Sequence, residues 1–500
     1  MKSKWNKKAK QILKTELIKR DISHEQLVDY LDNIGVKETK AGIDSKLSRG
    51  TFSAAFLLQC LDAIGCSYIS NEDLQNVVKE PEVEYKTTKK IFYKNKKSNI
   101  RLLDISDEYY SLNGLYNSVV SLFTGAGGLD IGLEQAGFKT VVCVENDINC
   151  RETIRFNRPD WLLFEEGQKF SQGKFEPREP GDIRKIDVNE LLKFANLKSG
   201  KVGLVVGGAP CQPFSNIGKR KGQEDKNNGD LFHEFVRMVK GIKPRAFIFE
   251  NVAGITQSKH NDVIKYMIES FAGSGYGISY TILNSANYGV PQRRERFFLI
   301  GFINFVNPAF PLPTHIKDKK AWEVFTKDFD RKPIKKPFNW TTVKDAFENL
   351  PSDYKKRDDY AVMNISPKVV ERMTYISQGQ NFKVLPMEIR PNCWKNGKHQ
   401  GQDTFGRLID KLPSVTIRTA AYNPAKGMYI HPFENRGLDI IEMAALQNFP
   451  IEWQFKCHNR ERITLVSGGK QIGNAVPPGL AKALGVAIRK QLHFIEKGQI

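Results

Sequence analysis

The sequence predicts an α/β protein, in which a parallel sheet is covered by helices on both faces and is preceded by a small all-α unit. From residue 117 onward, short apolar runs typical of buried strands alternate with segments of helical periodicity, which is the pattern of strands joined by crossover helices. Up to about residue 68, the chain instead reads as several short helices. The expected strands cover residues 118–123, 140–144, 201–206, 246–249 and 296–300.

The net charge points to a polyanionic partner. The chain has 76 Lys and Arg residues against 56 Asp and Glu residues, a formal net charge of +20. A surplus of this size favours nucleic acid as the partner. A basic, solvated surface without such a partner is the alternative.

The cysteines and the apolar runs predict a protein of the reducing cytosol. The seven cysteines are irregularly spaced and no pair forms a C-x-x-C motif, so we expect neither a disulfide framework nor a metal site. The first residues, MKSKWNKKAK, lack the apolar core of a signal peptide. No apolar run approaches the ~20 residues of a membrane span, so we expect a cytoplasmic protein with no membrane partner.

Residues 1–75 are expected to form a helical domain. Ser23 to Gln26 reads as a capping box that starts one helix, and a second helix is expected over about 38–47. Two short helices joined by a tight turn resemble a repressor-type helix-turn-helix domain. Three basic residues on or just after the second helix favour DNA binding: Lys40, Lys46 and Arg49. A helical bundle for protein contacts is the alternative.

The rest of the chain divides into four parts. Residues 76–116 are rich in Lys and Glu with little periodicity and are expected to be a linker. The strand–helix pattern of the core domain covers 117–302. Residues 303–410 are rich in Lys, Pro and aromatic residues without clear periodicity, and residues 411–500 return to helical segments. We expect the last part to rejoin the core domain.

A glycine-rich turn follows the first strand and opens a helix. Its sequence, FTGAGGLD, lets the backbone turn tightly and approach a ligand closely. The spacing is not the G-x-G-x-x-G of dinucleotide-binding dehydrogenases. The candidate ligand-binding residues here are Phe123, Thr124, Gly125, Ala126, Gly127, Gly128 and Leu129.

Two acidic residues are placed to bind a nucleoside. Glu145, followed by Asn146, ends the next strand about twenty residues after the glycine turn, where a carboxylate can accept hydrogen bonds from ribose hydroxyls. Asp182, followed by Ile183, lies in a turn where it could receive an adenine amino group. An Asp in a glycine-containing turn is also common for local reasons.

Cys211 is the candidate nucleophile. It lies in the loop GGAPCQPFS, which follows an apolar strand, and open parallel sheets bind ligands at such strand ends. A thiolate is a strong nucleophile when its pKa is lowered. A lone cysteine is usually inert, but a cysteine between two prolines in a strand-end loop is not typical of a core.

Three further motifs border strands or helices. Glu250-Asn251-Val follows one strand, the segment QRRER at 292–296 precedes another, and QIGNAVPP at 471–478 precedes the last helix. Charged residues at the border of an apolar strand favour a site there, with a charge-paired strand end as the alternative.

In this order, the blocks resemble the DNA (cytosine-5) methyltransferase family. The matching segments are FTGAGGLDIGLEQAGF, VEND, GDI, GGAPCQPFS, DLF, ENV, QRRERFFLIG and QIGNAVPP. The resemblance runs from about residue 118 to the C-terminus. It implies the S-adenosylmethionine (SAM)-dependent methyltransferase fold, a Rossmann-like mixed sheet, and makes residues 303–410 a target-recognition domain. Residues 158–180 look inserted relative to the family.

The resemblance implies methyl transfer from SAM to carbon 5 of a cytosine that is flipped out of duplex DNA and held in a covalent Cys211 adduct. It implies that Glu250 supports protonation at nitrogen 3, and that Arg296 contacts the cytosine carbonyl oxygen with Arg294 close by. Beyond the glycine turn, it implies cofactor contacts from Glu145, Asn146, Asp182, Ile183, Pro210, Leu231, Asn474 and Val476. Expected substrate contacts are Gln212, Ser215, Asn251, Gln292 and Arg418.

Two alternatives and several partners go with this resemblance. One branch of the family methylates transfer RNA, and some restriction–modification methyltransferases carry an N-terminal domain that regulates transcription. The expected partners are double-stranded DNA and a cognate restriction endonuclease in a bacterial cytosol. We expect a monomer, or a dimer formed through the N-terminal domain.

Overall fold

A computed structural model of the chain shows two structural units. The described residues are 9, 13, 17, 22–49, 52–64, 92–94, 100–106, 112, 114–164, 181–209, 231–256, 261–305, 307–330, 333, 336–395 and 403–498. Contacts within the chain divide it into residues 1–86 and residues 87–500.

The first unit is helical and has its own core. Its helices are α2 (His24–Asn33), α3 (Lys40–Arg49) and α4 (Ala54–Ala63). The capping box at the start of α2 is confirmed, because the Ser23 hydroxyl accepts from the Gln26 backbone at 3.2 Å and the Gln26 side chain accepts from the Ser23 backbone at 2.8 Å. The buried apolar residues are Leu13, Leu17, Leu27, Leu31, Ile43, Leu47, Phe56, Cys60, Leu61 and Ile64.

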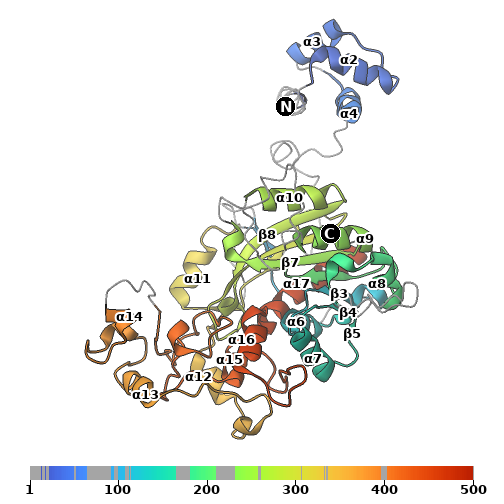
Figure 1. The fold of residues 1–500 in the computed structure, drawn as a ribbon. Helices are drawn as coiled ribbons and strands as arrows, with labels where there is room; N and C mark the ends of the chain where they lie inside the picture. The colour runs from blue at the N-terminus through green and yellow to red at the C-terminus, as the bar shows by residue number, and fades with distance from the viewer. Residues whose placement is uncertain are drawn as a thin grey trace. The chain divides into compact units, whose positions relative to one another are not determined.

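The second unit is built on a seven-stranded mixed sheet (Figure 1). In spatial order the strands are β5 (Leu162–Leu163), β4 (Lys139–Val144), β3 (Ser118–Leu122), β6 (Leu204–Gly207), β7 (Ala246–Val252), β9 (Glu295–Ile303) and β8 (Tyr276–Asn284). The first five pair in parallel, whereas β9 runs antiparallel to both β7 and β8. The mixed sheet that the family resemblance implied is therefore confirmed, whereas the strand–helix pattern by itself indicated only a parallel sheet and did not predict β8. The ten residues between β8 and β9 are too few for a crossover helix.

Helices cover both faces of this sheet. They include α6 (Gly128–Gln135), α7 (Ile148–Asn157), α8 (Val188–Phe194), α9 (Leu231–Ile242), α10 (Asn261–Ala272) and α17 (Pro478–Glu496). Alternate residues of β3 enter different cores: Val120 packs with residues of α8, α9 and α10, whereas Val119 packs with residues of α6 and α17. Period-two alternation therefore buries both faces of the central strand.

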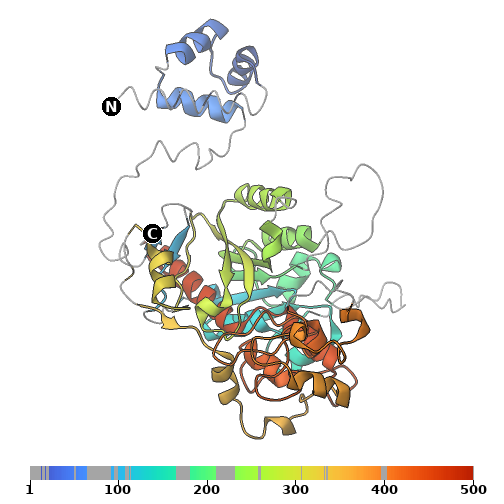
Figure 2. The ribbon, with the colours of Figure 1, turned by 90° about the vertical axis from the view of Figure 1, so that its left-hand side faces the viewer.

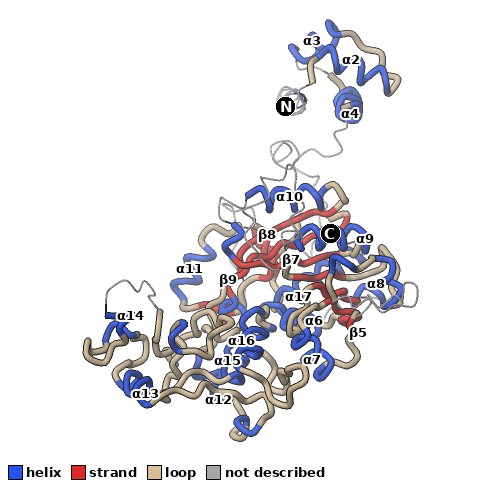
Figure 3. Tube along the Cα trace, viewed as in Figure 1, coloured by secondary structure: helices blue, strands red, loops and turns tan. Residues whose placement is uncertain are grey.

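The remaining elements are short and joined by long loops, as Figure 3 shows around α12 to α14. They are β1 (Phe92–Lys94), β2 (Arg101–Leu103), β10 (Phe310–Pro311), β11 (His315–Ile316), β12 (Phe338–Asn339), α11 (Lys319–Thr326), α12 (Val343–Glu348), α13 (Pro367–Thr374), α14 (Asn392–Lys395), α15 (Ile440–Leu446) and α16 (Leu465–Asn474). Strand β2, which lies in the expected linker 76–116, pairs with β1 and β10. None of the described helices is long and apolar enough to cross a membrane.

The C-terminal helix α17 packs closely against α6, the helix that follows the glycine turn. Both helices are labelled in Figure 1, and Figure 2 shows the ribbon turned by 90°. A Cβ added at Gly132 would lie 2.3 Å from the carbonyl oxygen of Pro478, and one added at Gly128 would lie 2.4 Å from that of Val476. Both positions therefore need glycine because backbone from the C-terminal segment occupies the space of a side chain.

Replacing Gly132 should loosen this contact. Gly132→Ala should destabilise the protein by about 2 kcal/mol, because the new methyl group must displace backbone rather than a flexible side chain. The measurement is the midpoint of thermal unfolding, which we expect to fall by several degrees. Gly254→Ala is the matched control, since a Cβ there meets nothing within 4 Å. Equal midpoints for the two variants would contradict this reading of the contact.

Candidate active site

A cavity of about 720 Å³ lies at the carboxyl ends of the parallel strands. This is the edge at which open α/β sheets bind ligands, and the volume suits a small organic molecule. Its described lining residues come from the segments after β3, β4 and β6, from the end of β7, from the start of β9, and from α16 and the segment after it: Phe123, Thr124, Gly125, Gly128, Leu129, Glu145, Asn146, Asp147, Cys150, Gly208, Ala209, Glu250, Asn251, Val252, Arg296, Lys470, Gln471, Gly473, Asn474, Ala475 and Val476.

The glycine turn after β3 forms one wall of the cavity. Phe123, Gly125 and Gly127 all have positive φ angles, of 55°, 57° and 82°. For Phe123 this is an uncommon backbone conformation. Gly127 caps α6 without any side-chain hydrogen bond, so the first N–H groups of α6 are not capped by that residue. A helix start of this kind favours a carboxylate or another anion.

Glu145 holds the glycine turn from the end of β4. Its two carboxylate oxygens accept hydrogen bonds from the backbone N–H groups of Gly125 and Asp147, both at 2.7 Å. Burial raises the pKa of Glu145 above its ordinary value, although these two hydrogen bonds act in the opposite direction. The carboxylate is thus fixed at the cavity wall.

Asp182 lies close to this wall but is already paired. Its carboxylate accepts two hydrogen bonds from the Arg184 side chain, at 2.9 and 2.8 Å, and this guanidinium lowers the pKa of Asp182. The preceding Gly181 packs against the Glu145 carbonyl, since a Cβ there would lie 2.0 Å from that oxygen. Asp182 does not line the described cavity, and Ile183 and Leu231 pack in or against the core beneath α8 and α9.

Glu250 and Arg296 form an ion pair inside the cavity. Glu250 lies in the buried part of β7, and its Oε1 atom lies 3.0 Å from Nε of Arg296 on the neighbouring strand β9. Burial raises the pKa of Glu250, while Arg296 and Arg294 act to lower it, with a net increase. A Cβ on Gly208 would lie 2.5 Å from the Glu250 carboxylate, so glycine after β6 makes room for this side chain.

Arg294 and Gln292 do not line the cavity but hold its walls together. Arg294 is fully buried and donates to the carbonyl oxygens of Ile417, at 2.9 Å, and Gly473, at 2.7 Å. Burial and the nearby Arg296 lower the pKa of Arg294 to about 9. Gln292 is equally buried, accepts from the Ile417 backbone at 2.8 Å and donates to the Leu446 carbonyl.

The other predicted residues fall into three groups. Asn474 and Val476 line the cavity from the end of α16 and the segment after it. Asn251 donates to the Ala209 carbonyl at 3.2 Å and so joins the ends of β7 and β6, whereas Arg418 is exposed and pairs with Asp403 at 3.2 Å. Four predicted residues lie outside the described residues: Pro210, Cys211, Gln212 and Ser215.

A family model fits most of the second unit. The model for C-5 cytosine-specific DNA methylases matches residues 117–490. The chain belongs to this family. The fold class, the enzyme class and the SAM cofactor expected from the sequence are thereby confirmed.

Known relatives agree with this methylase assignment. The chain is 32% identical to the type II methyltransferase M.XorII of Xanthomonas oryzae over 393 residues, which cover 75% of this chain and 84% of that protein. It is 34% identical to the type II methyltransferase M.PspPI of a Psychrobacter species over 387 residues, covering 76% and 80%. Residues 5–69 match a separate domain family of unknown function.

A solved structure supports the fold of the methylase. It is a prophage-encoded E. coli protein, described as a DNA modification methyltransferase, with a TM-score of 0.52 and 21% sequence identity. The match covers 75% of this chain and 99% of that chain. At this identity the likeness concerns the fold alone.

The cavity of the methylase fits SAM. The helix start at α6 suits the amino-acid carboxylate of the cofactor, and the acidic wall at Glu145 suits groups that donate hydrogen bonds. Two residues of this wall were missed at the sequence level. Asp147 caps α7, and its carboxylate lies 2.7 Å from the Lys470 ammonium of α16. The pair lies at the rim, because both residues line the cavity and 59% of the Lys470 side chain is exposed.

Breaking this rim pair should weaken cofactor binding. Lys470→Gln and Asp147→Asn should each raise the dissociation constant for SAM by about two- to fivefold, as expected for an exposed ion pair, because the pair joins two walls of the cavity. Asn keeps the cap on α7. The measurement is calorimetric titration with SAM, and the double variant should be no worse than either single one.

The control for this pair is Lys482→Gln, on an exposed position of α17. It removes the same charge from the methylase without touching the cavity. If Lys470→Gln bound SAM as Lys482→Gln does, the pair would have no role in the site.

Proposed function

We propose that this methylase transfers the methyl group of SAM to carbon 5 of a cytosine flipped out of a specific duplex sequence, with Cys211 as the nucleophile. The observation that carries the proposal is the buried Glu250–Arg296 pair at the cavity. The Glu250 carboxylate lies beside Gly208, and Gly208 is three residues before Cys211 in the sequence. This combines an acid and a cation for the polar edge of cytosine with a nucleophile for its ring.

Carbon 5 of cytosine is too weak a nucleophile to be methylated directly. In the proposed reaction the Cys211 thiolate adds to carbon 6, and the electron pair of the former double bond becomes available at carbon 5. SAM would supply the methyl group, as a cation equivalent, to that electron pair, and the bond between sulfur and the methyl carbon would break to leave S-adenosylhomocysteine. Loss of the carbon 5 proton to a water molecule then expels the thiolate and restores the ring.

Glu250 and Arg296 would act on the polar edge of the ring. Negative charge develops at nitrogen 3 and the carbonyl oxygen when the thiolate adds. Glu250, whose pKa is raised by burial, would hold a proton at nitrogen 3, and Arg296 would donate to the carbonyl oxygen. The buried Arg294 would act as a positioning residue, because its hydrogen bonds hold Ile417 and Gly473.

We also propose that the enzyme protects DNA in a restriction–modification system. The relatives named above are type II methyltransferases, and such enzymes modify sites that a cognate endonuclease would cut. Residues 303–410, and not the N-terminal unit, would supply the sequence recognition. In the N-terminal unit, Lys40 pairs with Glu25 and Lys46 with Glu38; pairs this close to solvent are weak, so this unit would bind DNA or regulate transcription only in addition to the recognition by residues 303–410.

The activity can be tested by sequencing methylated DNA from a methylation-free host that expresses the protein. We expect 5-methylcytosine at one short sequence motif and unmodified transfer RNA. Modified transfer RNA with unmodified DNA would instead establish the RNA alternative.

Variants of the two principal residues should separate chemistry from binding. Cys211→Ser should abolish methyl transfer, and Glu250→Gln should lower the rate by about 10²- to 10⁴-fold, since it removes a titratable proton donor. Both should bind SAM within a fewfold of the wild type by calorimetry. The control is Glu269→Gln on an exposed part of α10. Turnover by Cys211→Ser would disprove the assigned nucleophile.

A further inference from the structure

A short loop between Arg296 and Lys470 in the sequence, none of whose residues lines the cavity, presents an exposed aromatic ring. Residues 431–436, here called the Phe433 loop, are closed at their base by a bridge between Ile430 and Gly437 and by a 2.9 Å hydrogen bond from the His431 N–H to the Arg436 carbonyl. Phe433 at the tip is 61% exposed. The support beneath this loop is buried and polar.

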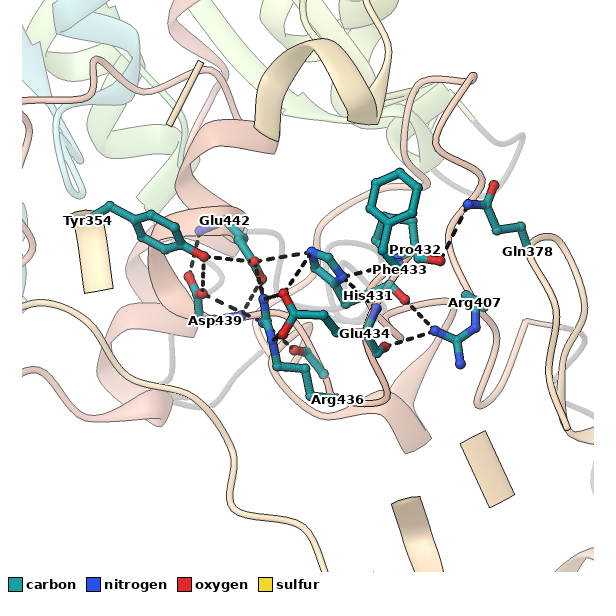
Figure 4. A network of polar contacts seen from close by, with 11 residues as sticks. Tyr354, Gln378, Arg407, His431, Pro432, Phe433, Glu434, Arg436, Asp439 and Glu442 are labelled. Carbon is teal, nitrogen blue, oxygen red and sulfur yellow. Dashed lines mark hydrogen bonds and ion pairs between the residues drawn. The ribbon is translucent and has the colours of Figure 1, made fainter. Parts of the chain in front are cut away.

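His431 holds the tip from inside the loop (Figure 4). Its Nδ1 atom accepts hydrogen bonds from the backbone N–H groups of Phe433, at 3.2 Å, and Glu434, at 3.0 Å. An imidazole that accepts at Nδ1 carries its proton on Nε2, which lies 3.4 Å from a carboxylate oxygen of Glu442. Burial lowers the pKa of His431, in agreement with the neutral ring that this geometry requires.

Arg407 holds the loop from below. Its buried guanidinium donates to the carbonyl oxygens of His431, at 2.7 Å, and Glu434, at 2.8 Å, and to the side-chain oxygen of Asn435, at 2.6 Å. It also donates to the carbonyl oxygens of Met373 and Ile376, at 2.7 and 2.6 Å. One side chain thus joins the Phe433 loop to the end of α13.

A third set of contacts ties the loop to α15. Arg436 donates to Glu434 within the loop, at 2.7 Å, and to both carboxylate oxygens of Glu442, at 2.8 and 2.5 Å. Glu442 and Asp439 form the capping box of α15, and both accept from the Tyr354 hydroxyl. The backbone of the Phe433 loop is therefore fixed from three directions.

The same support presents a second exposed ring. Tyr375, 47% exposed, lies between the two residues of the α13 end whose carbonyl oxygens Arg407 binds. Beneath it lies a small separate core that includes Ile376, Phe405 and Ile430. The α13 end and the Phe433 loop are thus one packed body, although the sequence places them on either side of residue 410.

We propose that Phe433 and Tyr375 form an aromatic contact surface for duplex DNA that extends the target-recognition region beyond residue 410. Exposed rings fixed on a rigid backbone bind at a low entropic cost. Aromatic side chains contact DNA by stacking on bases or by wedging between base steps. The inference rests on the proposed methylation of DNA.

The surrounding charge favours DNA over a protein partner. Residues 363–395, which carry Tyr375, contain five Lys and Arg residues against two Glu residues. Within the loop, the one acidic residue, Glu434, is paired with Arg436. The surface therefore combines aromatic rings with a local positive charge, the combination that suits nucleic acid.

The test compares Phe433→Ala with the wild type in binding to an unmethylated plasmid-derived duplex, by fluorescence anisotropy at several salt concentrations. We expect the dissociation constant to rise about tenfold, as for loss of one base–aromatic contact. The slope of log affinity against log salt should stay unchanged, because no phosphate contact is lost. Phe433→Trp, which keeps an aromatic ring, should bind DNA as the wild type does. The affinity of both variants for SAM should equal that of the wild type. Tyr375→Ala should show the same pattern.

The matched control is Phe156→Ala, which removes a ring that is 53% exposed on α7. If Phe433→Ala and Tyr375→Ala bound DNA as tightly as Phe156→Ala, the inference would be overturned, and the surface would serve a protein partner. A changed salt slope would equally overturn it, by showing that the loop acts through phosphate contacts. Failure of the wild type to methylate any DNA would disprove the proposed function but leave this binding result to stand by itself.

Discussion

The site of this methylase depends on the close approach of α6 and the C-terminal segment. Because Gly128 and Gly132 have no side chain, the carbonyl groups of Val476 and Pro478 can occupy the space that a Cβ atom would fill. Because α6 starts at the glycine turn, this contact places Val476 beside that turn, and Asn474 and Val476 join it in the lining of the cavity. The last quarter of the chain is therefore a structural wall of the cofactor site, and residues far apart in sequence form one cavity.

The segment QRRER, at the start of β9, contains both residues that hold the walls of the cavity together and a residue that lines it. Gln292 and Arg294 are fully buried, Arg293 and Glu295 are exposed, and Arg296 reaches the cavity. This is the alternation of an extended chain, so the sequence could predict which residues share a face. It could not predict that the Arg294 side chain would donate to two carbonyl oxygens of the C-terminal segment, so that, of these two arginines, it is Arg296 that pairs with Glu250.

The parts of the fold that local patterns determine were predicted well. The glycine turn, Glu145 and Glu250 follow apolar strands, and parallel strand ends meet at one edge. The strand–helix pattern indicated only a parallel sheet, because an apolar run carries no information about the direction of its strand, and the mixed sheet was implied by the family resemblance instead. Contacts such as Asp147–Lys470 and the Arg407 network were missed because they join distant segments through single side chains, for which sequence spacing carries no signal. The packing of α13 with the Phe433 loop was missed for the same reason.

Buried polar groups in this enzyme are held in two different ways, and the difference matches their proposed tasks. Arg407 is satisfied by fixed oxygens of the chain and serves to fix backbone. Glu145 receives two backbone hydrogen bonds and fixes the glycine turn, but its carboxylate also lines the cavity and keeps acceptor sites for a ligand. Glu250 has one carboxylate oxygen paired with Arg296 in a cavity, with a raised pKa. A group whose polar partners are not all supplied by the protein is available to a ligand, whereas a fully satisfied group rigidifies its surroundings. The cavity end of β7 is therefore the place where we propose proton transfer, whereas the Arg407 network is a support.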